Sequence, residues 1–192
     1  RVFCLSRGLG DVYKRQVNSR LTGYEDKKHI PRGPRAGDAD FPGYAEWSQR
    51  TQAGSFRINR YACTGPVKYI GQAALAKDVA NLQAAVKAAG VNEAFMTSAS
   101  PGVIAVFQPN QYYTTTEEYL EALAAAMKEE YEAIVAAGFI LQLDCPDVSG
   151  MGTASQPGHP PTDQAQRLEA LDHATANIPE DRIRLHLCWG NF

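Results

Sequence analysis

The sequence predicts an α/β fold in which helices cover a parallel sheet. Short apolar runs typical of buried strands alternate with longer segments whose apolar residues recur at helical spacing. An Ala-Ala-Gly join followed directly by a strand occurs at residues 88–90 and again at residues 136–138, which indicates two successive αβ units. Such alternation is typical of a β/α barrel or of an open doubly wound sheet, and periodicity does not choose between them.

The first predicted unit begins at Tyr61. Residues 61–66 end a short strand, and a helix follows until Gly90 stops it. The apolar positions of this helix are Leu75, Val79, Leu82 and Val86. Residues 93–98 form the next predicted strand, which the turn residues 100–102 close.

A second helix is predicted to open at Thr115, because Glu118 three residues later completes a capping box. The apolar stripe that should face a core consists of Leu120, Leu123, Met127, Tyr131 and Ile134. Gly138 ends this helix, and residues 139–144 follow at once as a strand.

A third helix is predicted from near Asp163, with Gln166 in the capping position, and it should fade by Pro179. Residues 183–188 then form the last strand.

The two ends of the chain differ from this pattern. Residues 1–16 resemble translated adaptor sequence and are set aside as non-native. Residues 17–60 are rich in Gly, Pro, Arg and Asp and are predicted to be loop or a long insertion. The αβ units occupy residues 61–192, and since a complete β/α barrel takes about 250 residues, the chain is expected to be a piece of one.

The composition is that of an ordinary soluble globular protein, with 44% hydrophobic and 21% charged residues. The 19 basic and 21 acidic residues give a formal net charge of -2, so no basic field exists to attract nucleic acid or a membrane surface. The four cysteines lie far apart without a C-x-x-C pair, which favours reduced thiols and a cytoplasmic location.

The last predicted strand carries a candidate metal site. Alternation places Ile183, Leu185 and Leu187 on one face and Arg184, His186 and Cys188 on the other. If the apolar face packs on the helix layer, His186 and Cys188 point inward at the end of the strand, where an imidazole and a thiolate can share one zinc ion. The alternative is a core histidine beside a small apolar cysteine.

The strand at residues 139–144 shows the same alternation. Ile140, Gln142 and Asp144 share one face, so Asp144 falls at the carboxyl end of the strand, where active sites of β/α barrels lie. A carboxylate there can hold a substrate ammonium group. A helix cap or a loop hydrogen bond is the competing interpretation of Asp144.

Other candidates are set aside. The glycines at residues 150–152 follow a strand, but a proline-rich stretch comes next instead of the helix that a dinucleotide loop requires. His29, His159 and His173 show no ligand spacing and are expected at the surface. A charge run on the second helix is interpreted as a solvated face and comprises Glu117, Glu118, Glu121, Lys128, Glu129 and Glu130.

Three segments together carry a family resemblance. They are residues 99–104 (ASPGVI), residues 129–134 leading into residues 142–147 (QLDCPD), and residues 185–191 (LHLCWGN). With residues 63–67 (CTGPV), they resemble the short, single-domain relatives of cobalamin-independent methionine synthase. The similarity covers roughly residues 21–192.

This resemblance implies that the chain is part of a (β/α)8 TIM barrel and lacks the first and last strands. It implies a Zn2+ ion bound by a histidine, a cysteine, a glutamate and a second cysteine. His186 and Cys188 match the first two of these ligands, and the other two are expected downstream of Phe192. Asp144 matches the aspartate that contacts the amino group of homocysteine, whereas residues 148–153 are less like the family.

The implied reaction is zinc-dependent transfer of a methyl group from a methyltetrahydrofolate-type donor to a thiol, with homocysteine as the leading acceptor. Coordination by zinc deprotonates a thiol and so makes it a nucleophile. The 192-residue chain alone is expected to be inactive, because a catalytic zinc usually has three protein ligands.

Two other functions compete with this one. An epoxide:thiol alkyl transferase that uses coenzyme M would share the same ligands. A metal-free barrel lyase of the uroporphyrinogen decarboxylase type would have a related fold without needing the histidine and cysteine pair.

Overall fold

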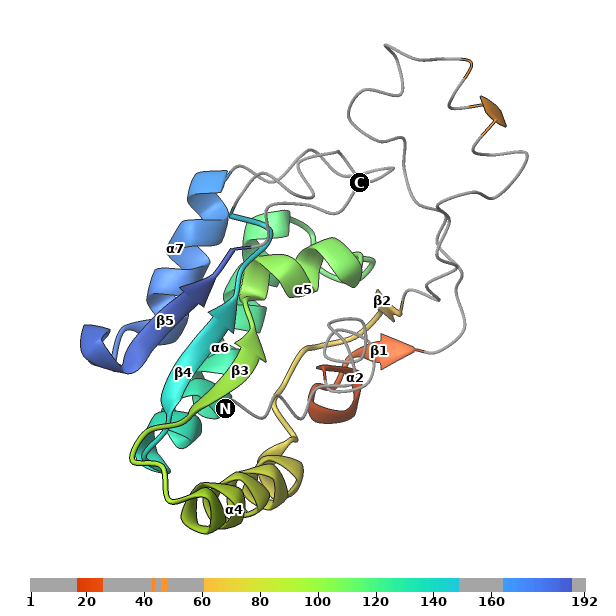
Figure 1. Ribbon diagram of the computed structural model, residues 1–192. Coiled ribbons are helices and arrows are strands. Elements are labelled where there is room, and N and C mark those ends of the chain that lie inside the picture. Colours follow the sequence, from red (N-terminus) through yellow and green to blue (C-terminus); the bar gives the residue numbers. More distant parts are fainter. Residues whose placement is uncertain (1–16, 26–42, 44–45, 48–60, 149–163, 188–192) are drawn as a thin grey trace.

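The structure is a computed structural model that describes residues 17–25, 43, 46–47, 61–148 and 164–187 (Figure 1). In chain order its elements are α2 (Val17–Arg20), β1 (Tyr24–Glu25), β2 (Ala62–Cys63), α4 (Gln72–Ala89), β3 (Phe95–Ala99), α5 (Pro101–Phe107), α6 (Thr116–Ala136), β4 (Ile140–Asp144), α7 (Gln164–Thr175), a 3-10 turn (Glu180–Arg182) and β5 (Ile183–His186). The predicted adaptor-like segment at residues 1–16 lies outside the described residues.

The centre of the fold is a parallel sheet of three strands in the order β3-β4-β5. Helix α6 passes behind this sheet in Figure 1, and α5 and α7 both pack against α6. The predicted α/β class with a parallel sheet is therefore confirmed. Closure into a barrel stays a prediction, because the described residues hold three strands of this sheet.

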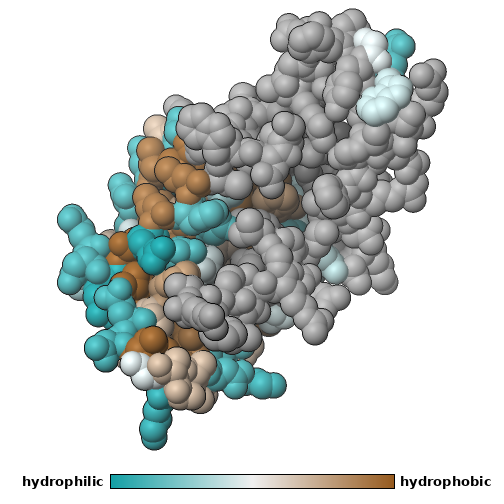
Figure 2. Space-filling model, viewed as in Figure 1, coloured by the Kyte–Doolittle hydropathy of each residue, from teal (hydrophilic) through white to brown (hydrophobic). Residues whose placement is uncertain are grey.

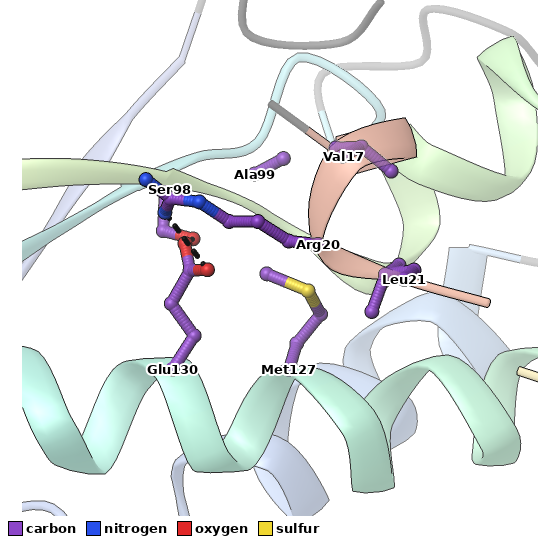
Figure 3. A pocket seen from close by; sticks show the side chains of 7 residues that line it. All are labelled: Val17, Arg20, Leu21, Ser98, Ala99, Met127 and Glu130. Atoms are coloured by element: carbon purple, nitrogen blue, oxygen red, sulfur yellow. Dashed lines mark hydrogen bonds and ion pairs between the residues drawn. The ribbon is translucent and has the colours of Figure 1, made fainter. Parts of the chain in front are cut away.

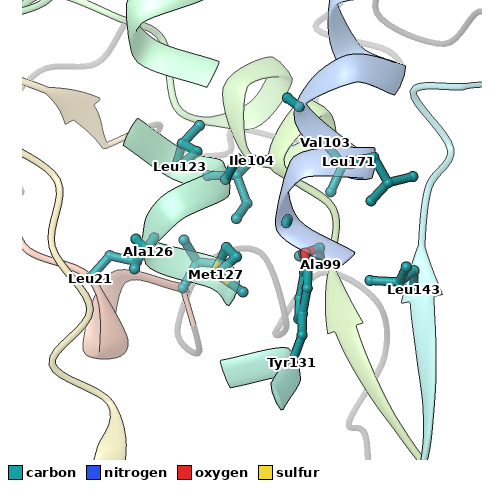
Figure 4. Packing of buried hydrophobic residues seen from close by; sticks show 14 of the residues in the cluster. Leu21, Ala99, Val103, Ile104, Leu123, Ala126, Met127, Tyr131, Leu143 and Leu171 are labelled. Carbon is teal, nitrogen blue, oxygen red and sulfur yellow. The ribbon is translucent and has the colours of Figure 1, made fainter. Parts of the chain in front are cut away.

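Helix α6 forms as the sequence predicts. The Thr115 hydroxyl accepts a hydrogen bond from the Glu118 backbone N–H at 3.1 Å, and the Glu118 carboxylate accepts one from the Thr114 N–H at 3.1 Å. The predicted apolar stripe is buried in full, at Leu120, Leu123, Met127, Tyr131 and Ile134. These side chains meet α5, α7 and the back of the sheet in one hydrophobic core (Figure 4).

Helix α4 ends where the sequence predicts. Gly90 has a φ of 63° and its N–H bonds the carbonyl oxygens of the last turn, which is the left-handed conformation that glycine adopts without a steric penalty. Leu75 is buried, whereas Val79, Leu82 and Val86 are half-buried against the core. The predicted apolar face is present, although α4 lies at the margin of the core.

Helix α5 is absent from the sequence prediction, which closed β3 with a turn at residues 100–102. The Ser100 hydroxyl instead accepts the Val103 N–H at 3.1 Å, and Pro101 occupies the first helical turn. A serine cap followed by proline is a helix start, so the turn prediction is wrong for a recognisable reason.

The second half of the sheet also follows the predicted order, with shifted bounds. Gly138 has a φ of 93° and leads into β4. Helix α7 ends at Thr175 and therefore before Pro179, as the sequence predicts. The Gln166 side chain donates to the Glu117 carboxylate on α6, and because Asp163 lies outside the described residues, the predicted capping role of Gln166 stays a prediction.

The prediction of loop is wrong for the first described segment, residues 17–25. Val17 and Leu21 are buried in the core, and β1 pairs with β2 as a small antiparallel sheet. Hydrogen bonds from Thr22 N–H to Lys68 O (2.9 Å) and from Ile70 N–H to Arg20 O (2.7 Å) extend this pairing. Local composition does not reveal a partner that lies more than forty residues away.

Two large hydrophobic side chains are exposed at the end of the described chain, on and just after β5. Leu185 and Leu187 are 53% and 50% exposed, and Figure 2 shows hydrophobic surface on this side of the molecule. Among the described helices, none has both the length and the apolar character that crossing a membrane requires.

Candidate functional site at the carboxyl edge of the sheet

The carboxyl ends of the three parallel strands lie side by side. Ala99 of β3 is in register with Asp144 of β4, which in turn is in register with His186 of β5. The prediction that Asp144 and His186 end adjacent parallel strands is confirmed. Ligand sites of α/β proteins lie at this end of the strands, so we call it the carboxyl-edge site.

Asp144 is held by the backbone on both sides. The Ser100 N–H donates to Asp144 O at 3.1 Å, and the next residue, Cys145, donates its N–H to His186 O at 2.9 Å. The Asp144 side chain is only 1% exposed. Its position is thus fixed by the sheet, which is what a substrate-binding carboxylate requires.

His186 lies beside this carboxylate at the end of β5. Its Nε2 atom is 3.9 Å from Asp144 Oδ1, which is within reach of an ion pair and too long for a hydrogen bond. The imidazole is 43% exposed, yet Nε2 itself is buried and has no hydrogen-bond partner in the described part of the chain. A buried nitrogen of this kind is available to bind a ligand from outside the chain.

The predicted alternation along β5 is confirmed in its parity. The register aligns Arg184 with Gln142 and His186 with Asp144, while Leu185 aligns with Leu143. The expected burial of the apolar face is wrong for Leu185 and Leu187, which are exposed. Helix α7 packs on α5 and α6, and β5 is an end strand of the described sheet, so neither leucine is covered.

The second predicted metal ligand, Cys188, lies outside the described residues. The expected approach of its sulfur to His186 therefore stays a prediction. Within the described ranges, no group of three or more His, Cys, Asp or Glu side chains could hold a metal ion.

A buried polar cluster beside Asp144 was not predicted from the sequence. The Ser100 hydroxyl donates to Asp147 Oδ1 at 2.7 Å, and Arg167 of α7 donates to Asp147 O at 3.3 Å. Burial raises the pKa of the Asp147 carboxyl, and the Ser100 hydrogen bond opposes this shift. A Cβ at Gly102 would collide with the Asp147 carboxylate, so a larger residue there would displace this side chain. The cluster fixes the loop that follows β4.

The two described cysteines are unsuited to nucleophilic chemistry. Burial raises the pKa of the Cys145 thiol to about 12 and that of the Cys63 thiol to about 11. Both are free and buried. A protonated thiol is neither a good nucleophile nor a metal ligand, so Cys145 is a core residue despite its place next to Asp144.

The interpretation of the charge run on α6 is correct for Glu117, Glu118 and Glu121, which are exposed, and wrong for Glu130. Glu130 is 2% exposed and forms an ion pair with Arg20. His173 lies near the surface against Glu121, as expected. His29, His159 and the glycines at residues 150–152 fall outside the described residues.

Comparison with known proteins supports the fold. No protein-family model and no curated protein sequence matches the chain. Among solved structures it resembles one described as "Putative Vitamin-B12 Independent Methionine Synthase from Listeria monocytogenes", with a TM-score of 0.52 and 23% sequence identity. The match covers 68% of this chain and 41% of that one, so this chain spans less than half of the length of its structural neighbour. At this identity the likeness shows the fold alone.

Proposed function

We propose that the chain is part of a zinc-dependent methyltransferase that transfers a methyl group from a methyltetrahydrofolate-type donor to the thiol of homocysteine. The observation that carries the proposal is the register that sets Asp144 beside His186 at the carboxyl edge of the sheet. The fold likeness to a structure named as a methionine synthase supports it. In this proposal Asp144 binds substrate, and His186 and Cys188 bind the metal in a longer, cytoplasmic parent protein.

One of the two proposed metal ligands, His186, lies within the described residues. The His186 Nε2 atom is buried without a hydrogen-bond partner in the described part of the chain, and an imidazole nitrogen in this position can bind a metal. Cys188 follows two residues later, so continued strand alternation would bring its sulfur to the same face. Zinc prefers nitrogen and sulfur ligands, and when bound with an open position it would supply Lewis-acid activation of a substrate thiol.

Asp144 would orient the substrate. A carboxylate forms strong, charge-assisted hydrogen bonds with an ammonium group. The backbone at Asp144 is fixed on both flanks by the hydrogen bonds that the Ser100 and Cys145 N–H groups donate. The amino and thiol groups of homocysteine are separated by a short carbon chain. A fixed carboxylate next to a metal-binding imidazole can therefore hold the amino group while the thiol lies near His186.

The test compares zinc content and homocysteine methylation in the parent protein and in its Cys188→Ala variant. We expect stoichiometric zinc and activity in the parent, and loss of both in the variant, since removal of a ligand opens a site that needs three. Cys145→Ala is the matched control, because the buried Cys145 thiol should leave zinc unchanged. An active Cys188→Ala parent, or tight stoichiometric zinc in the 192-residue chain alone, would refute the assignment.

A further inference from the structure

The carboxyl end of β3 lies beside a segment from the beginning of the described chain. In the described sheet β3 is an end strand that pairs with β4 alone. Val17 and Leu21 of the neighbouring segment line a small pocket together with Ala99 of β3 and Met127 of α6 (Figure 3). The first part of residues 17–25 thus packs beside the carboxyl end of β3, while the second part pairs with β2.

Arg20 joins this segment to two helices. Its Nη1 atom is 2.9 Å from Glu130 Oε2 on α6, and its Nη2 atom is 2.5 Å from Asp78 Oδ2 on α4. The arginine is 4% exposed, whereas the Asp78 side chain is 53% exposed. The buried partner of the guanidinium is therefore Glu130, and Figure 3 shows Arg20 reaching from α2 toward it.

Glu130 connects Arg20 to β3, because it also accepts a hydrogen bond from a β3 side chain. Its two carboxylate oxygens accept hydrogen bonds from the Ser98 hydroxyl at 2.8 Å and from the Tyr69 hydroxyl at 2.9 Å. The adjacent Tyr131 donates its hydroxyl to Ala99 O at 2.5 Å. The carboxyl end of β3 is thus bound to α6 next to Ser100, whose N–H holds Asp144 in the carboxyl-edge site.

We propose that residues 17–25 form a strap that holds the carboxyl end of β3 in place, with Arg20 as its latch. Without the guanidinium, the Glu130 carboxylate would be a buried charge lacking its counter-ion, and such a charge is costly inside a protein. Rearrangement of Glu130 toward water would release Ser98 and loosen the β3 wall of the carboxyl-edge site. Arg20 is in this sense a positioning residue that acts through Glu130 and Ser98.

A second contact of the strap is neutral. The Tyr24 hydroxyl lies 2.9 Å from the Tyr119 hydroxyl of α6. We expect this Tyr24–Tyr119 contact to remain when Arg20 is replaced. Loss of the Arg20 ion pairs should therefore leave the rest of the strap in place. The strap does not depend on the zinc chemistry proposed above, because its contacts involve neither His186 nor Cys188.

Amide hydrogen exchange of the whole chain tests the strap. In Arg20→Met we expect the Ser100 amide, which bonds Asp144 O, to exchange on the order of a hundredfold faster, as loss of one partner of a buried ion pair implies. The Cys145 amide, which bonds His186 O at the other side of β4, should change by less than about threefold. Arg184→Met, which removes an exposed arginine stacked on Phe95, is the control and should leave the Ser100 amide unchanged.

Equal acceleration of the Ser100 and Cys145 amides would overturn the latch, because Arg20 would then support the domain as a whole. No acceleration at Ser100 would overturn it as well. If Arg20→Met does not fold, Arg20→Lys is measured by the same criteria. Lysine keeps the charge but cannot reach Asp78 and Glu130 with one planar fork, so about tenfold faster exchange confined to Ser100 is expected.

Discussion

The two edges of the central sheet differ in how far their side chains are covered by the rest of the described chain. At the β3 edge, Glu130 forms an ion pair with Arg20 and accepts a hydrogen bond from the Ser98 hydroxyl, beside a strap in which Val17 and Leu21 are buried. At the β5 edge, Leu185 and Leu187 remain exposed, and His186 Nε2 has no hydrogen-bond partner among the described residues.

This difference distinguishes polar groups that stabilise the fold from polar groups that can bind a ligand. Buried polar atoms that find partners within the fold contribute to its stability and to its rigidity. A buried imidazole nitrogen without such a partner, located at the carboxyl ends of parallel strands, is available to a ligand. Glu130 therefore belongs to the framework, whereas His186 and Asp144 belong to the candidate site.

The largest expected effect is at the β3 edge. Glu130→Ala leaves the Arg20 guanidinium buried without its main partner, so we expect a loss of about 3–5 kcal/mol in the free energy of unfolding. Glu129→Ala changes the neighbouring, exposed glutamate and should cost less than about 0.5 kcal/mol. Urea denaturation of both variants measures the contrast, and equal losses would mean that Glu130 is not a framework residue.

A pair of leucines in register tests whether the β5 edge is uncovered. Leu143 is buried and Leu185 is its exposed partner on the neighbouring strand. Leu143→Ala should lower the free energy of unfolding by about 2–5 kcal/mol through the cavity it leaves. Leu185→Ala should change it by no more than about 0.5 kcal/mol. A large loss for Leu185→Ala in thermal or chemical unfolding would show that this edge is packed.

The tyrosine contact of the strap should contribute less. Tyr24→Phe removes one hydroxyl and its part-buried hydrogen bond with Tyr119, with an expected cost of about 1 kcal/mol. Tyr112→Phe, at an exposed tyrosine, is the control and should have no measurable effect. If the two variants unfold at the same denaturant concentration, the Tyr24 contact adds nothing to the strap.

The smallest effect concerns Cys63, next to the strap. Burial holds its pKa at about 11, above the ordinary value that applies in the unfolded chain. The unfolded state therefore loses its proton first, and the native state loses stability as the pH rises between these two values. Alkylation by iodoacetamide, followed by peptide mass spectrometry, should label Cys63 slowly at pH 8 until denaturant is added. Rapid labelling of the native protein would contradict this burial.

The sequence alone was sufficient to predict the features that depend on residue spacing within one element. The Thr115 cap, the stripe of α6 and the Gly90 stop depend on local spacing, and all three are confirmed. The adjacency of Asp144 and His186 was also predictable, because strands joined by one helical crossover are usually neighbours in a parallel sheet.

The sequence alone was insufficient to predict features that depend on contacts between residues far apart in the chain. Glu130 looks like its exposed neighbours, and only the packing of Arg20 from far upstream makes it a buried ion-pair partner. The contact between Ser100 and Asp147 likewise joins two loops that are separated by 47 positions. Helix α5 was missed for another reason, since a serine followed by proline begins a helix as readily as it closes a strand.

The most direct test of the carboxyl-edge site separates its two proposed roles in the full-length parent. We expect His186→Ala to lose both zinc and homocysteine methylation, because it removes a metal ligand. Asp144→Asn should retain zinc and lose methylation at least about tenfold, because it removes the charge that holds the substrate ammonium group. Zinc content by elemental analysis, measured with methylation rates on the same samples, gives the answer. Full zinc occupancy in His186→Ala, or unchanged methylation by Asp144→Asn, would contradict the account.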